Sequence, residues 1–451
     1  MRGLNVPINT TQTMHRLPDS AVAERARRRI TRRLMPFLIC LFVIAFIDRV
    51  NVGYAVLGMP KEMGFDTEVL GFGAGIFFVG YFLLEIPGTL LVENWSARLW
   101  LARIIISWGL LAVLTGFIRT PTQFYVARFI LGAAEAGFFP GVIIYLSHWF
   151  RQQDRAKAVA MFMVAIPVAN IFGSPMSGLI LGVHWLGLEG WRWVFILEGV
   201  PALVFGVATV YYLTDWPREA GWLDAEEREW ITRELEREKQ ARKAVRTYGI
   251  LEALRHRNVV LLALAYFCSL TSVYGINFWL PTIVKGLSGL SNLLVTGVAA
   301  LPYCAGLAAM LFVGWSSDRT GERRWHAAVS LLAVCLGLVL SAVAGQRAGL
   351  AVAMLCVACA GLYGYLPSFW ALPTAFLTES AAAVAVGLIN SIGNLGGFVG
   401  PYVVGYLTKR TGSFFPGVIY LACSALASAC LILCVRHSRG GEVHSPSTQQ
   451  S

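Results

Sequence analysis

The sequence has few charged residues: Asp, Glu, Lys and Arg make up 14% of its 451 residues, whereas 56% are hydrophobic. Soluble globular proteins carry about 25% charged residues, so this composition excludes a soluble fold. In or near the apolar runs there is no metal-ligand cluster, no Ser–His pair and no phosphate-binding loop. We therefore expect a polytopic membrane protein that is not an enzyme and uses no cofactor.

Other signals are also missing. The net charge is +11, but no basic stripe interleaved with aromatics supports binding to nucleic acid. Cys356 and Cys359 form a CxxC without a second pair or a nearby His, so small buried side chains are their expected role. No small-residue cleavage site follows the first apolar run, which argues against a cleavable signal peptide.

Twelve apolar runs remain, and each is about long enough to cross a hydrocarbon core that takes roughly 20 helical residues. We expect an all-α fold of twelve transmembrane helices in two six-helix bundles. The predicted parts are an N-terminal tail (1–33), a first bundle (34–213), a linker (214–257), a second bundle (258–436) and a C-terminal tail (437–451). The predicted spans are 34–57, 69–92, 100–118, 122–147, 157–183, 191–213, 258–284, 292–316, 326–345, 349–377, 383–408 and 414–435.

The loop charges predict the orientation. With both ends placed inside, 28 of the 37 Lys and Arg residues lie on the inner side and seven on the outer side. Cytoplasmic loops carry such an excess, so both termini are predicted to be cytoplasmic, in a bacterial-type inner membrane. The linker has ten Lys or Arg against ten Asp or Glu, which is typical of a solvated helix.

The two halves look repeated. Glu93 precedes Asp318 by 225 residues and Pro175 precedes Pro401 by 226, each pair at matching places in the two bundles. Duplicated halves around a site near the bilayer midplane are a recurring transporter design. The sequence therefore predicts pseudo-symmetric bundles with a central cavity.

The first span carries Asp48, Arg49 and Asn51 well inside the bilayer by its length. A charged side chain is costly there, and such residues usually line a substrate or ion pathway. The alternative is that Asp48 and Arg49 simply pair with each other. Sequence neighbours point about 100° apart on a helix, which favours separate partners.

Several motifs resemble the major facilitator superfamily. They are the central charged linker, Arg128–Gly132 (RFILG) and the loop Gly314–Arg324 (GWSSDRTGERR). More narrowly, three segments resemble its anion:cation symporter family, which includes tartrate, phthalate, galactonate and glucarate-type carriers: Asp48–Tyr54 (DRVNVGY), Gly132–Gly141 (GAAEAGFFPG) and Gly190–Gly199 (GWRWVFILEG). The resemblance covers roughly residues 30–436. It implies gating roles for Asp318 and Arg319, whereas the matching loop of the first half has degenerated around Glu93.

Ionisable residues inside the spans are confined to the first half, as Asp48, Arg49, Glu85, Arg128, Glu135 and Glu198. The second half offers neutral groups instead, which are Tyr274, Asn277, Tyr303, Trp370, Thr374, Asn390 and Asn394. This division indicates that the first half recognises charge while the second supplies shape and hydrogen bonds. The alternative is that the first-half charges form structural pairs.

Two arginines facing one cavity demand an anion, since guanidinium grips a carboxylate at two points. We therefore expect Arg49 and Arg128 to bind substrate; the alternative for Arg128 is bracing the first span or a gate. Burial penalises a charged carboxyl, which makes Glu135 a candidate for binding a coupling proton. The resemblance to galactonate-type carriers implies that role for both Asp48 and Glu135.

The same resemblance places Tyr81, Trp370, Thr374 and Asn390 along the substrate. Interhelical hydrogen bonds are the alternative for Tyr81 and Asn390. Glu85 and Glu198 are left out of the predicted binding site.

Together these features predict a proton-coupled symporter that takes up a small organic carboxylate by alternating access. The expected partners are the substrate anion, protons and the lipid bilayer, with a monomer as the working unit. An exchanger or exporter on the same fold is the main alternative. A membrane-embedded enzyme or a solute sensor fits less well, because the chain has no catalytic cluster and no room for a signalling domain.

Overall fold

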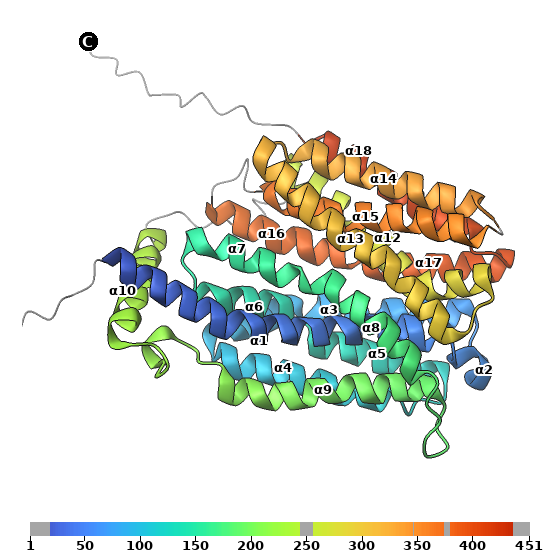
Figure 1. The fold of residues 1–451 in the computed structure, drawn as a ribbon, viewed down its shortest axis with the longest axis horizontal. Helices are drawn as coiled ribbons and strands as arrows, with labels where there is room; N and C mark the ends of the chain where they lie inside the picture. The colour runs from blue at the N-terminus through green and yellow to red at the C-terminus, as the bar shows by residue number, and fades with distance from the viewer. Residues whose placement is uncertain (1–18, 244–255, 346, 374–378, 436–451) are drawn as a thin grey trace, which may run out of the picture.

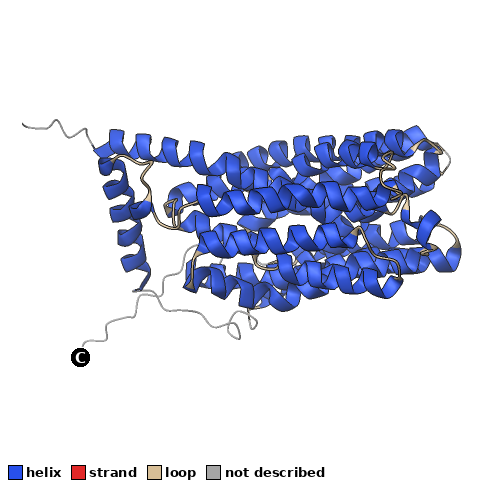
Figure 2. Ribbon diagram, turned by 90° about the horizontal axis from the view of Figure 1, so that it is seen from below, coloured by secondary structure: helices blue, strands red, loops and turns tan. Residues whose placement is uncertain are grey.

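The computed structural model describes residues 19–243, 256–345, 347–373 and 379–435. Over these ranges the chain consists of helices and loops, with no strand (Figure 2). Twelve helical segments are long and apolar enough to cross a membrane, which confirms the predicted all-α fold with twelve spans. Thr374 lies outside the described residues.

The first bundle contains six spans and a short helix, α2 (Met59–Met63), at one end of the molecule (Figure 1). Its spans are α1 (Asp19–Ala55), α3 (Thr67–Asn94), α4 (Ala97–Thr115), α5 (Pro121–Glu135) with α6 (Phe138–Ser147), α7 (Gln152–Met163) with α8 (Ala165–Ile180), and α9 (Gly190–Tyr212).

The second bundle has the same plan. Its spans are α12 (Arg257–Ser288), α13 (Asn292–Thr320), α14 (Arg324–Val343), α15 (Ala348–Ala371), α16 (Glu379–Asn394) with α17 (Gly396–Thr411), and α18 (Phe415–Leu433). Between the bundles, the short turn η1 (Pro217–Glu219) leads into α10 (Ala225–Lys243).

The helices differ from the sequence expectation in several places, and the fifth and eleventh spans, each predicted as one run, are divided into two helices. Helix α1 begins at Asp19, upstream of the predicted start at Leu34. The fourth span, predicted as one run, is interrupted directly after Glu135: Ala136 is extended and Gly137 has a φ of 84°. That left-handed conformation costs glycine little, so the chain can end α5 and begin α6 in the middle of the bundle.

Helix α10 crosses the ends of the spans at the end opposite α2 (Figure 1, Figure 2). It is fastened to the first bundle by ion pairs: Arg29 of α1 lies 2.9 Å from Asp224 and 2.7 Å from Glu227, and Arg151 lies 3.5 Å from Glu234. The linker helix therefore belongs to the first bundle by its contacts.

The bundles meet most closely toward the α2 end, where α3 packs on α17 and α8 on α13. Glycine permits this approach, since a Cβ on Gly71 would lie 2.5 Å from the carbonyl oxygen of Pro401. At the surface, Lys409 of α17 lies 2.9 Å from Asp66 and 2.7 Å from Glu68. The structure is therefore closed at the α2 end.

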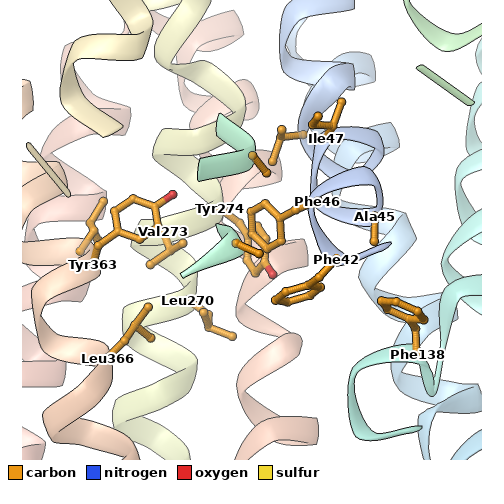
Figure 3. Close-up of a cluster of buried hydrophobic side chains, with 14 of the residues drawn as sticks. Phe42, Ala45, Phe46, Ile47, Phe138, Leu270, Val273, Tyr274, Tyr363 and Leu366 are labelled. Atoms are coloured by element: carbon orange, nitrogen blue, oxygen red, sulfur yellow. The ribbon is translucent and has the colours of Figure 1, made fainter. Parts of the chain in front are cut away.

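An apolar cluster fills the centre between the bundles. Phe42 and Phe46 of α1 and Leu270 and Tyr274 of α12 lie in this cluster (Figure 3). The candidate site sits beside it.

Candidate functional site

Arg49 of α1 connects the two bundles. Its guanidinium forms an ion pair with Glu135, at the end of α5, and donates a hydrogen bond of 3.3 Å to the hydroxyl of Tyr274 on α12. It also lies over the ring of Tyr81, 5.2 Å from the centroid. Glu135 and Tyr81 are buried, so Arg49 is held by a carboxylate, a phenol and an aromatic face.

Asp48 faces another way, as the helical geometry predicts. Its Oδ1 accepts a hydrogen bond of 3.1 Å from Asn51, while Oδ2 has no hydrogen-bond partner among the described residues. Asp48 interacts electrostatically with Arg128 and Glu135 as well as with Arg49. The alternative of a simple pair between Asp48 and Arg49 is not what the structure contains.

Arg128 of α5 is 1% exposed, and its Nε and Nη1 atoms have no hydrogen-bond partner within the described ranges. Its guanidinium lies 4.9 Å from the centroid of the Phe77 ring. Buried donors without acceptors are costly, so Arg128 is a cation whose hydrogen-bonding capacity is largely unused in this state.

A small cavity opens between these groups. It is lined by Arg49 and Arg128 from the first bundle and by Tyr274 and Asn277 from the second, with apolar walls. Its volume suits about one water molecule. The closed site is thus too small for an organic acid, and the bundles must separate to admit one.

Tyr274 and Asn277 were noted in the sequence only as neutral groups of the second half. The structure adds them to the site: both line the cavity, and the amide of Asn277 has no hydrogen bond of good geometry in the described structure. Their position in the middle of a span was the signal in the sequence that could have pointed to the site. The sequence does not show which face of the helix they occupy, because packing sets it.

Trp370 and Asn390 are not among the residues that line this cavity. Trp370 is half-buried and packs edge-on against Tyr266, with its indole N–H unpaired in the part of the chain described. Asn390 of α16 donates to Glu85 of α3 at 2.5 Å, next to a 3.0 Å bond from Ser391. This contact joins the bundles toward the α10 end.

The predicted gate residues sit apart. Asp318, in the last turn of α13, is exposed and pairs with Arg323 at 2.5 Å. Arg319 is exposed and lies 5.5 Å from the ring centroid of Trp315. Neither residue is brought to the cavity, and their gating role stays a prediction.

In this arrangement a ligand anion would compete with ionised Glu135 for Arg49, and a proton on Glu135 would favour the anion. Glu135 occupies the guanidinium that a carboxylate ligand would use, and a protonated Glu135 no longer could. Arg128 is a second cation, with two nitrogens that have no hydrogen-bond partner among the described residues. Asp48 is a second acid. The site therefore has the groups to link protonation with anion binding.

Known proteins resemble this chain over most of its length. Residues 37–401 match the family model described as Major Facilitator Superfamily. A protein named "Putative tartrate transporter" from Agrobacterium vitis is 42% identical over 94% of this chain and 98% of its own length. A "Quinolone resistance transporter" from Acinetobacter baumannii is 38% identical over 88% of this chain and 91% of its own. The crystal structure of a D-xylose-proton symporter superposes with a TM-score of 0.72 at 15% identity, covering 91% of this chain and 99% of that one.

Proposed function

The chain belongs to the Major Facilitator Superfamily, and we propose that it works as a proton-coupled symporter for a small organic carboxylate. The superfamily and the relatives make it a multi-pass membrane transporter rather than an enzyme. Proton coupling, substrate class and direction are the proposal. The observation that carries it is the ion pair between Arg49 and Glu135 in the wall of the cavity.

The coupling step follows from competition for Arg49. A carboxylate ligand cannot take the guanidinium while ionised Glu135 holds it, because two anions would then share one buried cation. Protonation of Glu135 removes its charge and releases Arg49 for bidentate binding. A proton and an anion then enter together, and the cavity keeps its net charge.

Asp48 and Arg128 are a second acid and arginine that interact, but without a direct hydrogen bond. Asp48 interacts with Arg128 electrostatically but does not hydrogen-bond to it. A second carboxylate of a dicarboxylic acid, or a hydroxyl, can use the unpaired nitrogens of Arg128. Tyr81, Trp370, Thr374 and Asn390 are proposed to line the substrate when the bundles separate.

The transport cycle is alternating access. In the proposed orientation both termini and α10 face the cytoplasm, so the α2 end faces outward. The closed contacts of α3 with α17 and α8 with α13 would then seal the outer side. Loaded carriers reorient only if the bound proton and anion each favour the closed state, and deprotonation toward the cytoplasm releases the substrate. We propose a monomer in the inner membrane.

The name of the tartrate relative supports a hydroxy-carboxylate substrate. The resistance transporter's name supports the alternative that this scaffold exports its substrate. Direction of transport separates the two.

Purified protein in liposomes tests the proposal. With an acidic exterior, we expect accumulation of tartrate or another acid from a panel of dicarboxylates, sugar acids and aromatic acids, and no uptake of neutral sugars. The E135Q variant should still exchange labelled for unlabelled substrate, since Gln leaves Arg49 free, but should lose accumulation driven by the pH gradient. If E135Q accumulates substrate like the wild type, Glu135 is not the coupling acid; if only neutral sugars are carried, the assignment of Arg49 is wrong.

A further inference from the structure

Glu198 is a buried acid that the proposed coupling step does not use. It lies in α9, is 2% exposed, and makes one hydrogen bond of good geometry, between its Oε1 and the hydroxyl of Ser177 on α8 at 2.6 Å. Its Oε2 atom has no such partner among the described residues. Glu198 lies about 12 Å along α9 from the α2 end.

The surroundings of Glu198 require it to be protonated in this state. Within the described ranges no Arg, Lys or His forms an ion pair with it, and the groups it interacts with are Ser177, Asn51, Asp48 and Tyr54. An ionised carboxylate buried without a cation is strongly unfavourable. The Ser177 hydroxyl has one proton and also lies 2.9 Å from the Gly173 carbonyl; if that proton goes to Gly173, Glu198 must supply the proton of the 2.6 Å contact.

Helices α1, α4 and α8 pack on α9. From α1, Asp48 and Tyr54 both interact with Glu198. Among the described residues of α8, the hydroxyl of Ser177 is the group that interacts with Glu198. Helix α4 contributes no titratable group that interacts with Glu198 in the described structure. Asp48 is thus the only other acid that Glu198 faces there.

Asn51 connects the two acids. Its amide nitrogen donates to Asp48 Oδ1 at 3.1 Å, and the same side chain interacts with Glu198. Asn51 Oδ1, Asp48 Oδ2 and Glu198 Oε2 are all buried without hydrogen bonds of good geometry in the described residues. Unsatisfied buried oxygens gathered around two acids call for a shared proton or an ordered water.

We propose that Glu198 binds a further proton during transport. Glu198 receives this proton from the α2 side and passes it to Asp48. The inference rests on the proposed function, because it needs Asp48 to change its charge. When a substrate anion occupies Arg128, Asp48 loses the cation that stabilises its ionised form. A proton then leaves Glu198 Oε2 for a bridging water, and that water gives one of its protons to Asp48 Oδ2. One O–H bond breaks at Glu198 and one forms at Asp48; Glu198 is reprotonated from the α2 side.

The variant E198Q tests this relay, with T209V as the matched control. Gln keeps a hydrogen-bonding side chain at position 198 but carries no exchangeable acid proton. Thr209 is also buried on α9, and the one hydrogen bond of its hydroxyl within the described ranges goes to the Phe205 carbonyl of the same helix. Both variants should exchange tartrate across liposomes within about twofold of wild type. E198Q should lose at least tenfold in uptake driven by the pH gradient and carry fewer protons per substrate, measured with a pH dye beside labelled tartrate.

The results separate two failures. A wild-type protein without proton uptake would contradict the proposed function. A proton-coupled wild type with unchanged uptake and proton count in E198Q would overturn the relay alone. If E198Q does not fold, infrared spectroscopy of the wild type and S177A tests the inference instead. Loss of the Ser177 hydroxyl should shift the band of a protonated carboxyl group at neutral pH. An unshifted band overturns the inference.

Discussion

Arg49 and Glu135 form an ion pair although 86 positions separate them in the sequence. One lies on α1 and the other at the point where α5 ends, so the pair joins the first span to the broken fourth span. Because the pair lies in the cavity wall, a ligand anion that reached Arg49 would have to compete with Glu135 for it.

Replacing Arg49 by Lys should weaken tartrate binding roughly tenfold to a hundredfold. Lysine keeps the charge but not the planar fork, and a hydrogen bond to a charged group contributes about 1.5–3 kcal/mol. Equilibrium binding to purified protein measures the effect. The control is R103K, since Arg103 is exposed and stacks on Trp100. Binding by R49K within threefold of wild type would contradict substrate contact at Arg49.

Replacing Lys409 by Gln should open the α2 end more often. Lys409 bridges Asp66 and Glu68 across the bundles, but the pairs are exposed and salt screens them. Spin labels at the exposed positions 61 and 411 should therefore report a larger open fraction in K409Q, and high salt should shift the wild type the same way. K409R is the control that keeps the charge. Equal distance distributions for K409Q and wild type would show that these ion pairs do not hold the end closed.

Replacing Gly71 by Ala should hinder closure of the same end by sterics rather than charge. The new Cβ would lie 2.5 Å from the Pro401 carbonyl oxygen, a backbone atom that cannot turn aside. We expect a several-fold loss of uptake with the open state favoured in the label distances, unaffected by salt. Gly297 is the control, because a Cβ there meets nothing within 4 Å. Normal uptake in G71A would mean that α17 moves away from the new methyl group without hindering closure, which would contradict the prediction.

Replacing Arg192 by Ala should destabilise the first bundle by about 2–4 kcal/mol, since buried acceptors lose a charged donor. Arg192 donates to the carbonyls of Gly116 and Ile118 at 2.9 Å each and to Glu62 at 2.8 Å. Thermal unfolding in detergent measures the loss. Arg192→Lys should recover only part of it.

The same contact predicts a pH dependence. Burial alone would raise the pKa of Glu62, but hydrogen bonds from Arg192 and Trp191 and the charge of Arg192 outweigh it and lower the pKa below its usual 4.5. Because the folded-state pKa is lowered, Glu62 contributes stability above pH 4.5 that is lost as the pH falls through the lowered value. Unfolding temperatures of wild type and E62Q should therefore converge in acid. A constant difference between them down to the lowest pH would contradict the pairing.

The sequence predicted the spans well because length and apolar composition alone define a membrane helix. It also predicted that Asp48 and Arg49 have separate partners, since that follows from helical rotation. It did not predict the break after Glu135, because Gly137 looks no different in the sequence from Gly132 or Gly141. Nor did it pair Arg49 with Glu135, or relate Glu198 to Asp48. Those contacts depend on how α1, α5 and α9 are rotated against one another, which no periodic pattern encodes.

The attachment of α10 to the first bundle has a practical consequence. Its Glu227 pairs with Arg29 of α1 and its Glu238 with Arg155 of α7, so a probe on its outer face should move together with the first bundle. Arg233 and Arg237 are exposed on α10. A dye or antibody fragment placed there, outside the apolar spans, would report rotation of one half against the other without touching any residue of the cavity between Arg49 and Tyr274.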